Sequence, residues 1–351
     1  MRVLPWVAAA ALLLLPAVVR SNFVLTMFVF TFILGIAAVS FNLIFGFTGQ
    51  LSMFHAAAFG LSAYVTHIAM TRLGIPFWSG VACAVVFVLV LSCIIGTICF
   101  RYRLKEFYFA VVTLAFAEMA RLTVLNWNSV TNGSLGIAIN EKATLWVPGA
   151  GTIAMDNSTV WYYVGLAALA VTLLVCHRVL ASWVGRCFGA LRLNDELAST
   201  LGINVFRYKL LAFMIGNAFA AIAGALYAWY IGFIEPEYLS IPQSLALISM
   251  VLLGGSASLV GPVVGALVLT ALPHLISLSA EARVMTYGAI LIFTILLLPR
   301  GIWGTLEGLR RRVQGASATS VQTLVETPVQ KPPEGAPPPA RESLGQAAEV
   351  R

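Results

Sequence analysis

The sequence predicts an all-α polytopic membrane protein with about eight to ten transmembrane helices. Of its 351 residues, 60% are hydrophobic and only 10% are charged, whereas a soluble domain carries about 25% charged residues. No Asp, Glu, Lys or Arg lies between Arg20 and Arg72. At about 1.5 Å per residue this stretch would make roughly 75 Å of helix, enough to cross a hydrocarbon core about 30 Å thick twice. These observations argue against a soluble enzyme.

Apolar segments of span length follow one another from the first residues to about residue 299. The first, 3–19, resembles a secretory signal peptide, but no A-x-A cleavage site closes it and Phe23 begins another apolar run, so we expect a retained span. Residues 313–351 contain six of the 15 prolines and predict a disordered cytoplasmic tail after a membrane domain, 1–312. The expected spans are 3–19, 23–45, 51–70, 75–100, 107–126, 160–180, 209–233 and 284–299.

Two breaks interrupt this pattern, near 46–52 and near 254–258, where glycines stand inside apolar stretches. Basic residues cluster in 101–105, in 178–209 and in 300–312, which places these segments and both termini in the cytoplasm. With that orientation, 241–278 must enter the membrane and return to the same side, as two short crossings or as a re-entrant hairpin turning near 254–256. Non-helical backbone at that depth must be buried in protein or line a wet cavity. The two breaks are also compatible with a weak internal repeat.

A long cytoplasmic segment, 185–209, mixes charges with an apolar rhythm. Leucines or valine at 193, 197, 201 and 205 predict one short amphipathic helix, ended by Gly202. A helix lying on lipid would favour Lys and Arg on its polar face, whereas this one presents Asp195 and Glu196. The segment therefore predicts a docking surface for a cytoplasmic partner.

Two sets of polar residues lie within apolar stretches. Glu118 and Arg121 share one helix face, and either line a pathway or proton relay, or lie at the outer interface where the helix ends. The second set surrounds the breaks and either packs helices together or lines a conduit. Its members are Thr48, Gln50, Ser52, His55, Ser256 and Ser258.

Nucleotide chemistry is not expected in this chain. The four lysines follow Leu, Glu, Tyr and Gln, so none completes G-x-x-x-x-G-K-[ST]. The histidines and cysteines show no metal-ligand spacing. We therefore expect no cofactor and no metal, and any ATP that drives transport must be bound by another polypeptide.

Residues 46–64, GFTGQLSMFHAAAFGLSAY, resemble the GYTGQLSLGHAAFFGIGAY stretch of permease subunits of ATP-binding-cassette importers for branched-chain amino acids. Gly49, Gln50, Ser52 and His55 match, whereas Phe54 replaces a usual glycine. Similar agreement runs through YFAVVTLAFAEMAR (108–121), TNGSLGI (131–137), LGINVFRYKLLAF (201–213), AGALYA (223–228) and VLLGGSASLVGPVVGA (251–266).

The resemblance implies a non-enzymatic permease in the bacterial inner membrane. Its expected partners are a second related permease, two ATPase subunits and an extracytoplasmic binding protein, with no role for nucleic acid. The resemblance also implies that 185–208 docks on the ATPase, and that 127–159 and 235–240 contact the binding protein. The residues expected to couple to the ATPase are Arg192, Asp195, Glu196, Ala198 and Gly202.

Two alternatives remain at this point. A permease of the same family for urea, amides or aromatic acids would share all these motifs, because the binding protein largely selects the substrate. A secondary transporter driven by protons through Glu118 and Arg121 is the more distant alternative.

Overall fold

The computed structural model describes most of the predicted membrane domain. It covers residues 12–16, 21–102, 104–140, 143–147, 151–155, 157–256, 258–276, 280–297 and 301–305. The predicted span 3–19 lies largely outside these residues, and the predicted tail 313–351 lies outside them entirely.

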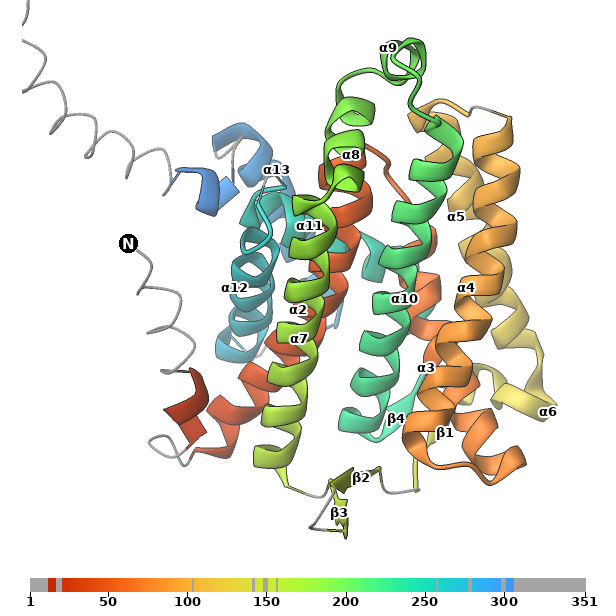
Figure 1. The fold of residues 1–351 in the computed structure, drawn as a ribbon. Helices are drawn as coiled ribbons and strands as arrows, with labels where there is room; N and C mark the ends of the chain where they lie inside the picture. The colour runs from red at the N-terminus through yellow and green to blue at the C-terminus, as the bar shows by residue number, and fades with distance from the viewer. Residues whose placement is uncertain are drawn as a thin grey trace, which may run out of the picture. The chain divides into compact units, whose positions relative to one another are not determined.

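The chain folds as an all-α bundle that agrees with the apolar segments of the sequence (Figure 1). Five helices are long and apolar enough to cross a membrane: α2 (Asn22–Thr48), α4 (Phe77–Arg101), α5 (Glu106–Asn126), α7 (Ser158–Ala181) and α10 (Val205–Ile231). Four other helices of the described residues complete the bundle: α3 (Phe54–Leu73), α11 (Ile241–Gly254), α12 (Gly261–Ile276) and α13 (Ala280–Leu297). These elements confirm a multi-pass membrane protein.

The centre of the bundle is formed by α2, α3 and α10. In α2 and α10, 61% and 56% of the most apolar stretch is buried, against 33% in α4 and 22% in both α5 and α7. Glycines allow the central helices to approach closely. A Cβ added at Gly224 would lie 1.8 Å from the carbonyl oxygen of Phe59, and one at Gly216 would lie 2.5 Å from Cδ1 of Ile44.

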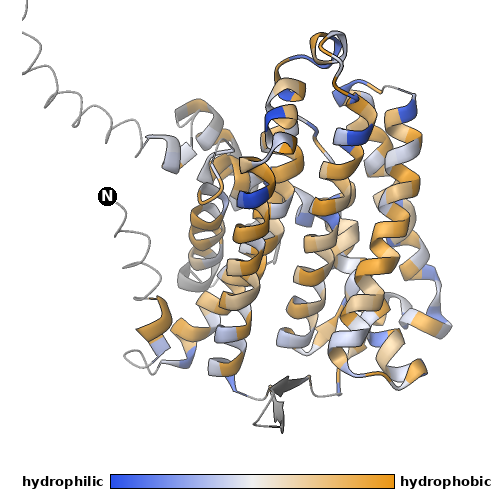
Figure 2. Cartoon of the chain, in the orientation of Figure 1, coloured by the Kyte–Doolittle hydropathy of each residue, from blue (hydrophilic) through white to orange (hydrophobic). Residues whose placement is uncertain are grey.

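Short elements occupy the two ends of the bundle. At one end lie α8 (Trp183–Leu193) and α9 (Asp195–Thr200), beside the turn from α4 to α5 (Figure 1). Hydrophobic residues run along most of α4, whereas hydrophilic residues gather around α8 and α9 (Figure 2). The other end carries α6 (Asn128–Thr131), η1 (Gly133–Leu135), β1 (Ile137–Ala138), β2 (Thr144–Val147), β3 (Gly151–Ala154), β4 (Phe233–Ile234) and η2 (Pro236–Leu239).

Two antiparallel strand pairs tie this second end together. Strand β1 pairs with β4, with Ile137 opposite Ile234, and so joins the segment after α5 to the segment after α10. Strands β2 and β3 form a local hairpin with Thr144 opposite Ala154.

The predicted break near 46–52 is real, and it returns the chain into the bundle. Helix α2 ends at Gly49, whose φ of 75° lies in the left-handed region that glycine tolerates. The next helix begins only at Phe54, and its His55 contacts Ala37 of α2. Ala37 precedes the last residue of α2 by about 16 Å of helix rise. The non-helical residues 49–53 therefore run back alongside α2 toward its middle.

The predicted break near 254–258 separates two short helices. A Cβ at Gly254 would touch Gly261, and one at Gly265 would touch Met250, so α11 and α12 pack antiparallel. The start of α11 and the end of α12 therefore lie at the same end of this helix pair, as the sequence predicts for 241–278, of which 277 and 278 lie outside the described residues. The two helices are about 21 and 24 Å long, each shorter than a hydrocarbon core of about 30 Å.

Both breaks meet at the C-terminal half of α2. The Asn42 amide nitrogen donates a hydrogen bond of 2.8 Å to the carbonyl oxygen of Ser258. A Cβ at Gly46 would lie 2.3 Å from the carbonyl oxygen of Ser256. Helix α2 is therefore the element that links the two irregular segments.

Candidate functional site

The predicted amphipathic helix of the segment 185–209 is wrong in its boundaries. Leu193 ends α8, and Asn194 separates it from α9. The Asn194 side-chain oxygen accepts hydrogen bonds from the N–H groups of Glu196 (2.8 Å) and Leu197 (3.0 Å) and so caps α9. The i, i+4 rhythm across 193–205 therefore spans three helices rather than one, since Val205 begins α10.

The two carboxylates of α9 lie in different environments. Asp195 forms an ion pair with Lys209, whose side chain is only 8% exposed. Glu196 is exposed and forms no ion pair with the described residues. The Asp195 side chain is itself 41% exposed, so both carboxylates reach the surface, and they differ in that Asp195 is paired with Lys209 whereas Glu196 is not paired among the described residues.

The other predicted coupling residues surround these two. Ala198 is buried, and Arg192 is exposed at the end of α8. Gly202 adopts a φ of 82° in the turn that leads from α9 to α10. A cleft of about 630 Å³ lies between this turn and the α4–α5 turn, and Arg101, Lys105, Glu196 and Asn204 are among its lining residues.

Large apolar side chains cover the outside of α8 and α9. Leu193 is 87% exposed, Leu201 is 72% exposed and Leu197 is 61% exposed. No described residue of the chain covers them. Exposed apolar residues gathered beside a charged rim are typical of a protein interaction surface.

The opposite side of α8 is anchored in the bundle. Phe188 is fully buried and packs against Leu43 of α2 and Ala212 of α10. Because protein interiors are closely packed, a displacement of α8 must move these neighbours as well. The exposed surface of α8 and α9 is thus connected through Phe188 to α2, the helix that both breaks contact.

His55 lies at the centre of the polar set around the breaks, and only 1% of it is exposed. Its Nδ1 lies 3.1 Å from the side-chain oxygen of Asn217 on α10. Its Nε2 lies 3.1 Å from the carbonyl oxygen of Ala37 and 3.2 Å from Oγ of Ser40, both on α2. One side chain therefore joins α2, α3 and α10.

The remaining predicted residues of this set are mainly enclosed. The Thr48 hydroxyl donates a hydrogen bond of 2.6 Å to the carbonyl oxygen of Ile44 within its own helix. Gln50 and Ser52 are 2% and 1% exposed, and their side chains have no hydrogen-bond partner among the described residues. Ser256 and Ser258 are half-buried, and the Ser258 hydroxyl accepts a hydrogen bond of 2.8 Å from the N–H of Gly261 at the start of α12.

Sequence reasoning missed three polar residues of this region: Ser40, Asn42 and Asn217. All three are fully buried. Asn42 and Asn217 carried a usable signal, because an amide inside an apolar span is unfavourable unless it bonds to another helix. The sequence alone did not show which helix each one would meet.

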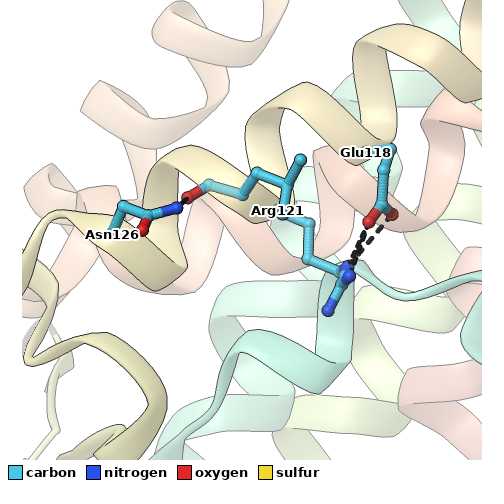
Figure 3. Close-up of polar contacts among 4 residues, drawn as sticks. Glu118, Arg121 and Asn126 are labelled. Atoms are coloured by element: carbon cyan, nitrogen blue, oxygen red, sulfur yellow. Dashed lines mark hydrogen bonds and ion pairs between the residues drawn. The ribbon is translucent and has the colours of Figure 1, made fainter.

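Glu118 and Arg121 form an ion pair on α5 (Figure 3). The Arg121 Nε donates to both oxygens of Glu118 at 3.0 Å. The two side chains are 33% and 27% exposed, and α5 continues to Asn126, two turns beyond Glu118. Arg121 lies five residues, about 8 Å of helix rise, before this end, so the pathway interpretation and the outer-interface interpretation both stay predictions.

A second acidic pair follows α10, outside the spanning helices. Burial raises the pKa of the Glu235 carboxyl, and the nearby charge of Glu237 raises it further. Glu237 is exposed and also attracts Arg121 of α5. The ion pair on α5 is thus followed, toward the strand-bearing end, by another negative charge.

Comparison with known proteins identifies the family. The family described as "Branched-chain amino acid transport system / permease component" matches residues 23–298. The high-affinity branched-chain amino acid transport system permease protein LivM of Escherichia coli is 27% identical over 290 residues, covering 78% of this chain and 68% of LivM. The corresponding permease protein LivH is 29% identical over 284 residues, covering 77% of this chain and 91% of LivH.

A third relative extends the comparison to another genus. The permease protein BraD of Pseudomonas aeruginosa is 24% identical over 284 residues, covering 77% of this chain and 91% of BraD. The family match contains both breaks, the ion pair of α5, and α8 with α9. The chain therefore belongs to the permease family of branched-chain amino acid transport systems.

Proposed function

We propose that this chain is one of two related permease subunits of an ATP-binding-cassette importer in the bacterial inner membrane. The importer takes up branched-chain or other small amino acids that an extracytoplasmic binding protein delivers. Two ATPase subunits supply the energy, and this chain carries out no bond chemistry. The similarity to both LivM and LivH supports a permease that works beside a related one.

The observation that carries the proposal is the exposed surface of α8 and α9, with its leucines and the accessible carboxylate of Glu196. We propose that the ATPase binds this surface and pushes or pulls α8 during its cycle. Phe188 then transmits the displacement to Leu43 of α2. Because both breaks contact α2, its movement alters the packing of the irregular segments, and a central translocation cavity between the permease subunits opens to alternate sides.

Reversing the charges of α9 tests this docking. We expect Asp195→Arg combined with Glu196→Arg to reduce co-purification of the ATPase at least about tenfold, because opposed charges and loss of complementarity disfavour the complex. The Glu196→Arg single variant should give most of this loss, since Asp195 already pairs with Lys209. Pull-down of the ATPase by the tagged permease measures the effect.

A matched control changes an exposed residue at the other end of the bundle. Asn128→Arg also adds a positive charge at an exposed site and should leave the complex intact. If the double variant still binds the ATPase and supports hydrolysis stimulated by loaded binding protein, the placement of the contact is wrong. Uptake by the permease pair in membranes without ATPase subunits would instead favour a secondary transporter.

A further inference from the structure

The exposed faces of α4 and α5 differ in one respect that a membrane makes important. On α4, the large exposed side chains near its middle are all apolar and suited to lipid: Val86, Phe87, Val90 and Ile94. On α5, exposed Met119 and Leu122 surround the partly exposed Glu118–Arg121 pair. Glu118 lies about 18 Å along α5 from Glu106 and about 12 Å from Asn126, at which the helix ends.

Lipid is a poor cover for such a pair. Charged groups at membrane depth are unfavourable, and they normally face the protein interior or a water-filled cavity. No described residue covers the exposed part of this pair. The face of α5 therefore requires water or a polar partner, whereas the face of α4 requires neither.

Arg121 also retains unused hydrogen-bonding capacity. A guanidinium group carries five N–H donors, and Glu118 engages the Nε and one Nη of Arg121. The described residues provide no further hydrogen bond to its side chain. The remaining N–H groups form an edge that matches a second carboxylate in a bidentate arrangement, without displacing Glu118.

Glu237 supplies the complementary charge. It is exposed on η2 and attracts Arg121 across the contact between α5 and η2. A molecule that bears both a carboxylate and an ammonium group fits a surface that carries a cation on α5 and an anion on the contacting η2. Inside the membrane, the carboxylate of such a molecule would be paired with Arg121 and its ammonium group with Glu237.

Building on the proposed function, we propose that the exposed face of α5, together with η2, forms one wall of the translocation pathway. Along this wall Arg121 receives the carboxylate of a zwitterionic amino acid and Glu237 receives its ammonium group. Glu118 is a positioning residue, because it holds the guanidinium so that the free edge faces the pathway. The enclosed polar set around His55 takes no part in contacting the substrate.

Water accessibility provides the first test. In the assembled importer, with the five native cysteines replaced by alanine, Met119→Cys on α5 is compared with Val90→Cys on α4. The two positions are 57% and 54% exposed and lie near the middle of their helices. A charged, membrane-impermeant thiosulfonate reacts with thiolate in water. We expect it to modify Met119→Cys at least ten times faster than Val90→Cys, and equal, slow rates would overturn the proposal.

Neutral variants then test the role of Arg121 in uptake of radiolabelled leucine. We expect Arg121→Gln to lower uptake about tenfold or more through loss of a charge-assisted bidentate contact, and Glu118→Gln to lower it about threefold or less. The double variant should remain as defective as Arg121→Gln. Recovery of uptake in the double variant, or equal loss in both single variants, would mean that the pair only neutralises itself, which overturns the proposal.

The two proposals fail in different ways. If the unmodified importer takes up no amino acid, the proposed function is wrong whatever α5 contacts. If it takes up leucine, while Met119→Cys is unreactive or the double variant recovers uptake, only the assignment of the pathway wall is wrong. Permease content of the membranes and ATPase stimulation by loaded binding protein, measured for every variant, identify loss through misassembly.

Discussion

Two polar groups lie within the helical bundle, and their surroundings differ. His55 is 1% exposed and contacts α2 and α10 from α3. The Glu118–Arg121 pair is about one-third exposed, and both residues belong to α5. The first group satisfies its polar atoms inside the chain and holds three helices together. The second is paired within one helix, and part of both side chains stays exposed.

His55 therefore has a packing role inside the chain, whereas the Glu118–Arg121 pair is accessible to a ligand or a partner. A buried side chain that bonds to two other helices contributes to the stability of the bundle, and its loss leaves unpaired groups behind. An exposed i, i+3 ion pair contributes little to stability, typically below about 1 kcal/mol. Polarity at membrane depth therefore does not identify a pathway by itself. The exposed fraction of the polar side chain has to be considered as well.

The largest expected effect comes from filling a close backbone contact between α3 and α10, two of the helices that His55 joins. In Gly224→Ala the new Cβ would lie 1.8 Å from the carbonyl oxygen of Phe59, so α3 and α10 must separate. We expect the free energy of unfolding to fall by about 3 kcal/mol, at the upper end of overpacking effects. Thermal unfolding of the purified chain in detergent measures this.

Gly189→Ala is the matched control, because a Cβ at this position in α8 has no neighbour within 4 Å. Alanine is the better helix former, so stability should be unchanged or rise by a few tenths of a kcal/mol. Equal loss in both variants would mean that the closeness of α3 and α10 does not limit stability.

Removing the two polar groups tests the comparison directly. We expect His55→Ala to lower the free energy of unfolding by about 2 kcal/mol, since it removes buried volume and leaves the side-chain oxygen of Asn217 without its partner. Glu118→Gln should change it by less than about 1 kcal/mol. The same unfolding assay compares the two variants, and a larger loss for Glu118→Gln would contradict the division into packing and contact roles.

The smallest effect concerns Glu235, whose pKa is raised by burial and by Glu237. A carboxyl with a raised folded-state pKa favours the protonated form, so its ionisation lowers stability. The penalty is absent below the unfolded pKa, develops as pH rises through the folded pKa, and then stays constant. Glu235→Gln should therefore stabilise the chain near pH 8 but not near pH 4. Unfolding midpoints at both pH values measure this, and an equal gain at both would contradict it.

The order of the spans followed from hydrophobicity because each span is long and carries few charges. Expected spans such as 107–126 and 160–180 agree closely with α5 and α7. The coupling segment was harder, because one capping residue, Asn194, divided a continuous apolar rhythm into separate helices. A side-chain cap competes locally with helix continuation, and periodicity does not register it.

Scarcity of charge and the thickness of a membrane were enough to predict the multi-pass helical fold and the two breaks. The contact of both breaks with α2, the enclosure of His55 by Ser40 and Asn217, and the free edge of Arg121 became visible only in the packed bundle. Crossing a membrane depends on the composition of one segment, whereas burial and partnership depend on which segments pack together.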